Sequence, residues 1–191
     1  MIANPEGARL DIFAAPTPAA WAADNARFKA FADGRFIGPA GETTCVAGKG
    51  GVIAASAKTE GDGASPLGVW PLLFILYRPD RCKAPASGLP VIPLRPHDGW
   101  CDAPDHPLYN SPIRRPFQPS HEALWREDRL YDVIVVLGHN LFPMVPGAGS
   151  AIFWHQTHPT GRPTEGCIAL EPDALTAQLA LAAPGDALQI L

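Results

Sequence analysis

Residues 131–137 read YDVIVVL and give the strongest strand signal in the chain. Their β-branched and aliphatic side chains favour a pleated, buried segment. Residues 150–154 (SAIFW) follow a turn sequence rich in proline and glycine, and they predict a second strand. The first run leads into a Gly-His-Asn triplet and the second into His155. The sequence therefore predicts two strands that both end at polar residues suited to a functional site.

The remaining strand signals are shorter or less regular. Residues 69–77 form an apolar run after a polar Gly/Pro segment and predict a buried strand. Residues 43–55 predict two short strands around a Gly-rich turn, as in a hairpin, and residues 9–13 alternate in a strand-like way. Residues 186–191 predict a final strand. With their many turn residues, these signals favour a mainly β fold.

Short helices are predicted at three places. Residues 18–31 could form one, residues 120–130 begin with Ser120 as a candidate N-cap, and an amphipathic pattern starts near Pro172 and stops at Pro184-Gly185. Residues 79–119 are rich in proline and have little periodicity, so they predict a long structured loop. Loops of this length are usually functional, and we expect this one to cover or border a site; disorder is the alternative.

Length and composition limit the organisation and the partners. The chain has 191 residues, 47% of them apolar, which predicts a single domain over residues 1–191, with 1–40 a less certain N-terminal extension. Charged residues make up 18% and the formal net charge is -4, without charge runs, so nucleic acid and anionic membranes are not expected partners. The sequence contains no apolar run long enough for a membrane span and no secretory leader. Either the protein works in the cytoplasm or an export signal has been removed.

The residues that can carry chemistry lie in residues 152–170, IFWHQTHPTGRPTEGCIAL. A cysteine nucleophile needs a base, a group that orients the base, and donors for the oxyanion. His155 ends a predicted strand, and Cys167 follows twelve positions later across a turn-rich loop that can bring the two together. Gly166 removes a side chain where a substrate must approach, and the amides of Glu165, Gly166 and Cys167 are candidate oxyanion donors. We expect the histidine and these amides to depress the pKa of Cys167.

Several ordered segments resemble the L,D-transpeptidase catalytic domain (YkuD) family. The signature of a strand-borne histidine followed by S/T-x-G-C is matched by His155 and by Thr164-Glu165-Gly166-Cys167, and the family's [ST]-P-x-G turn by Ser65-Pro66-Leu67-Gly68. The likeness is strongest to a compact bacterial subgroup with GDGxSPxG, DGWC, LWREDxLYD, VLGHN and EGCIAL segments, which occur in that order from about residue 43 onward.

The resemblance implies a mainly β catalytic domain, a YkuD-like sandwich or barrel with a few short helices and a long Pro-rich loop. Cys167 would be acylated by a peptidoglycan stem peptide and pass the acyl group to an amine of a second stem peptide or to a D-amino acid. His155 would be the base, oriented by the backbone carbonyl of Gln156. The resemblance also implies no cofactor or metal, covalent inhibition by carbapenem-type β-lactams, and a place in the periplasm or cell envelope.

Two departures from the family pattern concern the substrate. Glu165 stands where many members have histidine, and Ala169 stands where many have arginine. If that arginine contacts a substrate carboxylate, another cation must supply the role, with Arg126, Arg162, Arg114 and Lys58 as candidates. The residues that we expect on the substrate side of the site are His139, Asn140, Trp154, Thr164, Arg126 and Lys58.

Alternative functions remain open from the sequence. Water could resolve the same acyl-enzyme, which would give an L,D-carboxypeptidase or endopeptidase. His155, His158, His139 and Cys167 could instead hold zinc in an amidase, although no carboxylate base motif accompanies them. A non-catalytic wall-binding module is the third class. Cys45 and Cys82 are expected to be structural, whereas Cys101 is expected to form a disulfide, to pack, or to line the site.

Overall fold

The structure is a computed structural model, and it describes residues 26–191. The strand predicted over residues 9–13 and most of the helix predicted over 18–31 lie outside the described residues. Within the described part of the chain, no helix is long and apolar enough to cross a membrane.

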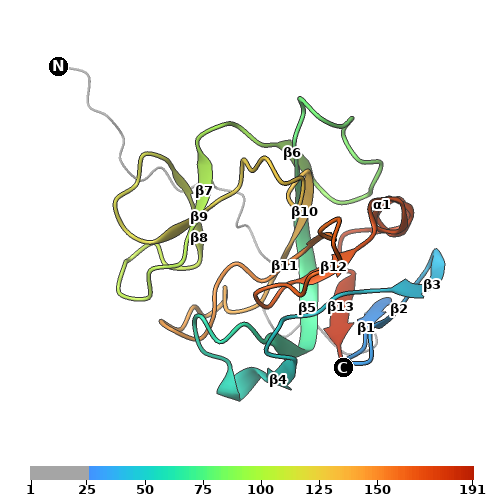
Figure 1. The fold of residues 1–191 in the computed structure, drawn as a ribbon, viewed down its shortest axis with the longest axis horizontal. Coiled ribbons are helices and arrows are strands. Elements are labelled where there is room, and N and C mark those ends of the chain that lie inside the picture. Colours follow the sequence, from blue (N-terminus) through green and yellow to red (C-terminus); the bar gives the residue numbers. More distant parts are fainter. Residues whose placement is uncertain (1–25) are drawn as a thin grey trace.

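One sheet of ten strands dominates the fold, and its longest strand, β5 (Ser65–Tyr77), runs through its centre (Figure 1). The main path has the order β12-β11-β10-β5-β13-β1-β2-β3, and β4 and β6 pair in parallel with the two ends of β5. The other strands of this sheet are β1 (Phe28–Ala30), β2 (Arg35–Gly38), β3 (Gly41–Thr44), β4 (Val52–Ala54), β6 (Val91–Pro93), β10 (Val133–Leu137), β11 (Phe153–Gln156), β12 (Ile168–Leu170) and β13 (Ala187–Ile190).

Hydrogen bonds between Val46 and Ala169 close this sheet on itself. Each residue donates its N–H to the carbonyl of the other, at 2.8 Å in both directions. Val46 follows β3 at one end of the strand order, whereas Ala169 lies in β12 at the other end. The main sheet is therefore a near-barrel, which confirms the predicted fold class.

The near-barrel encloses the first of two apolar cores. Phe28 of β1, Phe36 of β2 and Trp154 of β11 pack together there, with ring centroids 5.2–6.5 Å apart. Leu175 and Leu179 reach the same core from α1 (Pro172–Leu179), which lies beside the sheet (Figure 1). These contacts fix β11 and β12 against the rest of the barrel.

The second core lies on the opposite face of the main sheet and is covered by a smaller sheet. This smaller sheet has the order β8-β7-β9 and consists of β7 (Asp98–Cys101), β8 (Ser111–Arg114) and β9 (His121–Ala123). Trp100 of β7 meets Phe153 of β11 edge to face, with ring centroids 5.2 Å apart. Because side chains alternate along a strand, Phe153 and Trp154 belong to different cores. Cys167 belongs to the second core.

Two of the predicted helices are wrong where the structure describes them. Residues 28–30, the described end of the first, form β1, which pairs in parallel with β13. Residues 121–123 of the second form β9, and the residues after β9 form bends and a turn. Trp125 there lies under the Arg78 guanidinium at 3.8 Å, and Glu122 turns toward Tyr131. Tertiary contacts of this kind override a local helical preference.

Most of the other predicted elements are confirmed, but one hairpin is wrong. The strands over residues 69–77, 131–137 and 186–191 and the C-terminal helix are confirmed, although the helix ends at Leu179. The hairpin over residues 43–55 is wrong, because β3 pairs with β2 and β4 with β5. The long Pro-rich segment is ordered but contains β6, β7 and β8.

Candidate active site

Parallel pairing of β11 with β12 places His155 and Cys167 on the same face of the sheet. His155 lies opposite Ala169 and Trp154 lies opposite Ile168, so Cys167 directly precedes the paired part of β12. Side chains two residues apart share a face, which groups Cys167 with Ala169 and with the neighbouring His155. The predicted base and nucleophile thus reach one face from adjacent strands, although their sequence separation is twelve residues.

Cys167 is part of the second core, and the residue is 7% exposed. Its Sγ donates to the Ala151 carbonyl at 3.2 Å and accepts from the Phe153 N–H at 3.3 Å. Ala151 has a φ of 51°, a left-handed conformation that is uncommon for alanine. This irregular residue explains why β11 begins at Phe153 instead of at the predicted residue 150.

Two hydroxyl groups hold the backbone of Cys167. Its carbonyl accepts from Thr164 Oγ1 at 2.6 Å and from Ser65 Oγ at 3.4 Å. Ser65 is fully buried, and its Oγ also accepts from the Gly48 N–H at 3.0 Å. Thr164, predicted to contact substrate, thus holds the backbone of Cys167, the predicted nucleophile. Sequence reasoning gave no role to Ser65, although its place in the Ser-Pro-x-Gly segment was the available signal.

Gly166 is required by its backbone surroundings. Its φ is 130°, and a Cβ built there would lie 2.9 Å from the Ala64 carbonyl oxygen. The glycine therefore makes room for residue 64 of this chain, whereas the sequence predicted room for a substrate. Its N–H donates to Thr164 Oγ1 at 3.2 Å, so this amide is already engaged. Of the predicted oxyanion donors, the amides of Glu165 and Cys167 are left as candidates.

The His155 ring is oriented by the neighbouring backbone. Its Nδ1 lies 2.7 Å from the Gln156 carbonyl oxygen. Because a carbonyl only accepts, Nδ1 carries the hydrogen in the neutral ring and Nε2 keeps the lone pair of a base. Burial lowers the pKa of His155 to about 4, and the Arg126 cation also acts to lower it. His155 is therefore neutral near pH 7.

Tyr131 and Glu122 form a second layer behind His155, and sequence reasoning missed both. The Tyr131 ring meets the imidazole edge to face at a centroid distance of 5.2 Å. Its hydroxyl donates to Glu122 Oε1 at 2.8 Å, and Arg126 Nη1 reaches the same oxygen at 3.2 Å. The Arg126 guanidinium also lies over the Tyr131 ring at 5.0 Å. Tyr131 is the first residue of the strand signal over 131–137, which was the only hint in the sequence.

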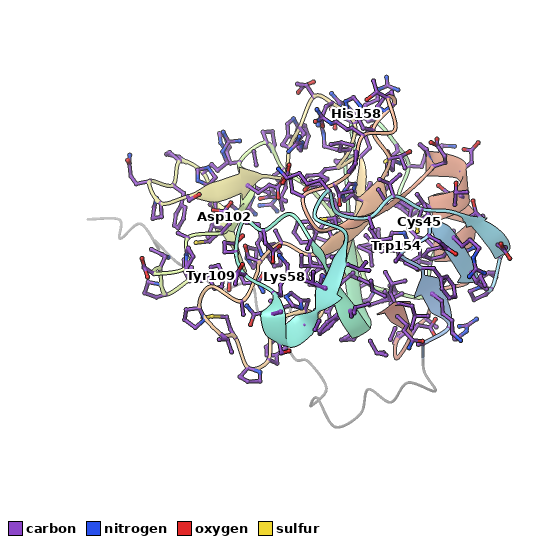
Figure 2. The ribbon with its side chains drawn as sticks, turned by 60° about the horizontal axis from the view of Figure 1, so that its bottom comes forward. Cys45, Lys58, Asp102, Tyr109, Trp154 and His158 are labelled. Atoms are coloured by element: carbon purple, nitrogen blue, oxygen red, sulfur yellow. The ribbon has the colours of Figure 1, made fainter. Side chains whose placement is uncertain are left out.

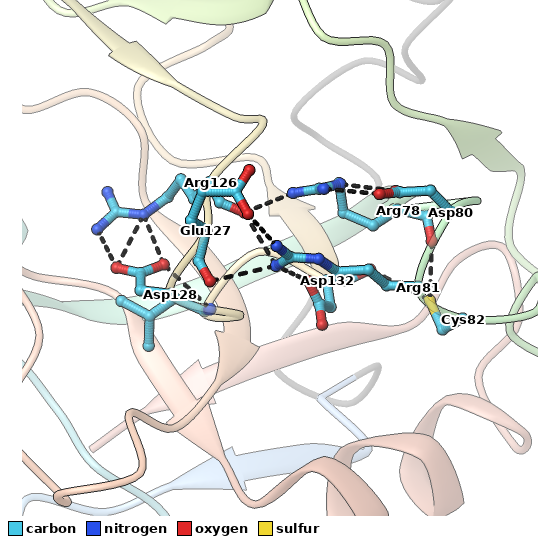
Figure 3. A network of polar contacts seen from close by, with 9 residues as sticks. Arg78, Asp80, Arg81, Cys82, Arg126, Glu127, Asp128 and Asp132 are labelled. Carbon is cyan, nitrogen blue, oxygen red and sulfur yellow. Dashed lines mark hydrogen bonds and ion pairs between the residues drawn. The ribbon is translucent and has the colours of Figure 1, made fainter.

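Arg126 is anchored by a neighbouring acid as well. Its Nη2 pairs with Asp128 Oδ2 at 2.6 Å, and Figure 3 shows this pair beside the network of Arg78, Arg81 and Asp132. Arg162 lies 3.8 Å from the same carboxylate oxygen. Two of the predicted cations, Arg126 and Arg162, thus meet at the Asp128 carboxylate. Arg126 is also close enough to His155 to lower its pKa.

The thiol of Cys167 is more weakly acidic than expected. Burial raises its pKa to about 12, and the Glu122 carboxyl adds to the rise. The predicted depression of this pKa is therefore wrong, because desolvation outweighs the Phe153 N–H and the nearby cations Lys58 and Arg126. A neutral thiol and a neutral imidazole are the resting partners.

Several predicted substrate contacts have structural partners instead. Trp154 lies in the first core, on the face opposite Cys167, and Figure 2 shows it near Cys45 and away from Lys58 and Tyr109. Lys58 is 5% exposed and pairs with Asp62 at 2.5 Å. Asn140 holds its own loop through the Val145 N–H and carbonyl and the Gly149 carbonyl.

The histidines outside the site do not gather around Cys167. His139 Nε2 contacts the Ala148 carbonyl at 3.0 Å, and its ring meets Trp70 at 4.7 Å. Burial lowers the pKa of His139 to about 4. His158 is bonded to Thr160 on a peripheral loop (Figure 2). Among the described residues, no group of three or more His, Cys, Asp or Glu side chains could hold a metal ion.

The other cysteines and cations are accounted for separately. Cys45, Cys82, Cys101 and Cys167 are all free thiols. Cys45 and Cys82 donate to backbone carbonyls. Arg114 pairs with Asp98 on the smaller sheet, and Glu165 pairs with Lys49 at 2.8 Å on the surface.

The fold is a near-barrel, and its site has a histidine on β11 and a cysteine directly before the adjacent parallel strand β12, both on the same face of the sheet. Residues 22–190 match the YkuD family, described as the L,D-transpeptidase catalytic domain, and the chain belongs to that family. Searches of curated proteins and of solved structures returned no significant match.

Proposed function

We propose that the protein is a peptidoglycan L,D-transpeptidase that uses Cys167 as nucleophile and His155 as general base. The observation that carries the proposal is the orientation of His155. Its Nδ1 is fixed on the Gln156 carbonyl, which leaves Nε2 unprotonated on the face that also carries Cys167. Stem peptides are the substrates that membership in the family implies.

In the first half-reaction, His155 Nε2 takes the thiol hydrogen as Sγ attacks a carbonyl carbon of the donor stem peptide. Backbone amides near Cys167 stabilise the oxyanion of the tetrahedral intermediate. The C–N bond then breaks, the leaving amine takes the hydrogen from His155, and a thioester remains on Cys167.

In the second half-reaction, an acceptor amine gives a hydrogen to His155 and attacks the thioester carbonyl. The C–S bond breaks, Cys167 regains its hydrogen, and a new amide joins the acyl group to the acceptor. The acceptor is the amine of a second stem peptide or of a D-amino acid. Because such peptides lie outside the cytoplasmic membrane of bacteria, the proposal places the protein in the cell envelope.

The test is mass spectrometry of muropeptides incubated with the purified protein, beside Cys167→Ala and Cys82→Ala. Cys82 is a matched control because it is another free thiol, and its Sγ is bonded to the carbonyls of Arg78 and Asp132. Cross-linked or amino-acid-exchanged products that vanish only in Cys167→Ala support the proposal. Shortened peptides alone would mean hydrolysis, and products unaffected by Cys167→Ala would refute the assigned nucleophile.

A carbapenem offers a second readout of the same nucleophile. We expect a covalent adduct on Cys167, located by peptide mapping, with none on Cys45, Cys82 or Cys101. An adduct on one of those three thiols would contradict the assignment.

A further inference from the structure

Asn110 is a buried amide residue outside the site described above. It lies between β7 and β8, is 2% exposed, and has a left-handed φ of 52°. Its Nδ2 donates to the carbonyls of His139 at 3.1 Å and Asn140 at 2.8 Å. Its Oδ1 accepts from Trp100 Nε1 at 2.9 Å and from the Ala151 N–H at 3.1 Å. A primary amide has two donor hydrogens and two acceptor lone pairs, and all four are used.

One of these four bonds connects Asn110 to Cys167 through a single residue, Ala151. Ala151 gives its N–H to Asn110, and its carbonyl accepts from Cys167 Sγ at 3.2 Å. Ala151 has a φ of 51°, and a non-glycine residue keeps such a conformation only when its surroundings enforce it. The bond from Asn110 supplies that constraint at the point where the chain enters β11.

We propose that Asn110 is a positioning residue for Cys167, holding Ala151 so that its carbonyl accepts a hydrogen bond from the thiol in the resting protein. The inference rests on the proposed role of Cys167 as nucleophile. A hydrogen bond donated by the neutral thiol favours the neutral form over the thiolate. In the resting protein the Cys167 S–H then points at the Ala151 carbonyl, and attack requires the S–H to leave this hydrogen bond and give its proton to His155.

Other charged and titratable groups also act on this thiol. Glu122 from β9 raises the pKa of Cys167, whereas Lys58 and Arg126 lower it. Tyr131 packs in the same core, and His155 lies on the adjacent strand. The test therefore changes Asn110 and leaves all five of these groups in place.

The experiment measures the rate at which iodoacetamide alkylates Cys167 as a function of pH, with the adduct quantified by peptide mass spectrometry. Asn110→Gly removes the side chain and suits the left-handed φ. Asn110→Asp keeps an acceptor for the Ala151 N–H but adds a negative charge. Gln178→Ala is the control, because Gln178 is also 2% exposed and bonds Ala40 and Gly41 through its amide, away from Cys167.

We expect the alkylation midpoint of Cys167 to fall by about one pH unit in Asn110→Gly, the size expected for one lost hydrogen bond to the thiol. It should stay or rise in Asn110→Asp and remain unchanged in Gln178→Ala. A midpoint in Asn110→Gly equal to that of the unmodified protein would overturn the proposal. Equal shifts in all three variants would also overturn it, because they would indicate general loosening.

If Asn110→Gly shows no cooperative melting transition, the titrations of the unmodified protein and of Asn110→Asp decide. A midpoint of Cys167 in the unmodified protein at or below about 8.5, the ordinary value for a thiol, would overturn the proposal. A midpoint well above that value, not lowered in Asn110→Asp, would support it. Alkylation requires no turnover, so failure of the muropeptide assay would count against the proposed function and leave this result separate.

Discussion

At the scale of single residues, Cys167 and His155 are both neutral because both are buried. Burial raises the pKa of the thiol to about 12 and lowers that of the imidazole to about 4. In the proposed mechanism, transfer of the thiol hydrogen must then accompany attack on the substrate, since no preformed ion pair exists. Such a pair of groups is in its reactive protonation state across the whole range between the two values.

The pH dependence of acylation follows from this. The second-order rate constant for acylation by a carbapenem should be level, within about twofold, from about pH 6 to pH 9. His155→Gln should be slower by at least about 100-fold across that range, because the base is lost. A rate that climbs tenfold per pH unit would show that the free thiolate reacts, and would contradict the neutral pair.

Tyr131 should matter more through its ring than through its hydroxyl. Tyr131→Phe keeps the edge contact with His155 and loses the bond to Glu122, so we expect kcat to fall by about tenfold. Tyr131→Leu loses the ring as well, and its kcat should fall by about 100-fold, because the imidazole is no longer held in place. Equal losses in the two variants, measured by steady-state kinetics with folding checked by thermal melting, would argue against ring packing.

At the scale of elements, the loop before β12 packs against the start of β5 and the residue before it. Gly166 faces the Ala64 carbonyl, and Ser65 bonds to the Cys167 carbonyl. The first residue of the Ser-Pro-x-Gly segment thus holds the backbone of Cys167.

Gly166→Ala should be costly for this reason. The new Cβ would meet the Ala64 carbonyl oxygen at 2.9 Å, in a backbone with φ of 130°, and we expect a loss of roughly 3 kcal/mol in unfolding free energy. Gly161→Ala is the control, because that glycine also has a positive φ, 67°, but has open space around it. Its loss should be about 1 kcal/mol, and urea denaturation of both variants measures the difference.

The elements that sequence reasoning recovered are those with strong local patterns. Residues 131–137 carry consecutive β-branched side chains, and the C-terminal helix has proline at its start. The helix predicted after Ser120 is wrong, because Glu122 and Trp125 make tertiary contacts that no local pattern reveals. Cys167 and His155 were identifiable from their motif, whereas Asn110 was not, since its partner Ala151 is 41 positions away.

At the scale of the whole molecule, two buried neutral histidines couple folding to pH. His139 and His155 both have a folded-state pKa of about 4, below the ordinary value of about 6.5 in an unfolded chain. Between these values the unfolded chain binds more protons, so the stabilisation is complete above pH 6.5 and is lost as pH falls toward 4. Glu122 acts in the opposite direction, because burial raises its pKa.

The free energy of unfolding should therefore fall by roughly 2 kcal/mol per histidine between pH 7 and pH 4.5. Urea unfolding at the two pH values measures this fall in the unmodified protein and in His139→Gln. The variant should lose about half of the pH dependence. If the unfolding free energy changes equally with pH in this window with and without His139, burial does not lower the pKa of His139 in the folded protein.

Because β11 and β12 pair in parallel, the relative position of His155 and Cys167 does not depend on the length of the chain that connects them. Backbone bonds on both strands, together with the bond from the Thr157 N–H to the Leu170 carbonyl, set the position of His155 relative to Cys167. The connecting residues 158–163 are mostly exposed and contribute no bond to either side chain. We therefore expect that loops of other lengths and sequences can replace residues 158–163 while His155 and Cys167 keep their relative positions.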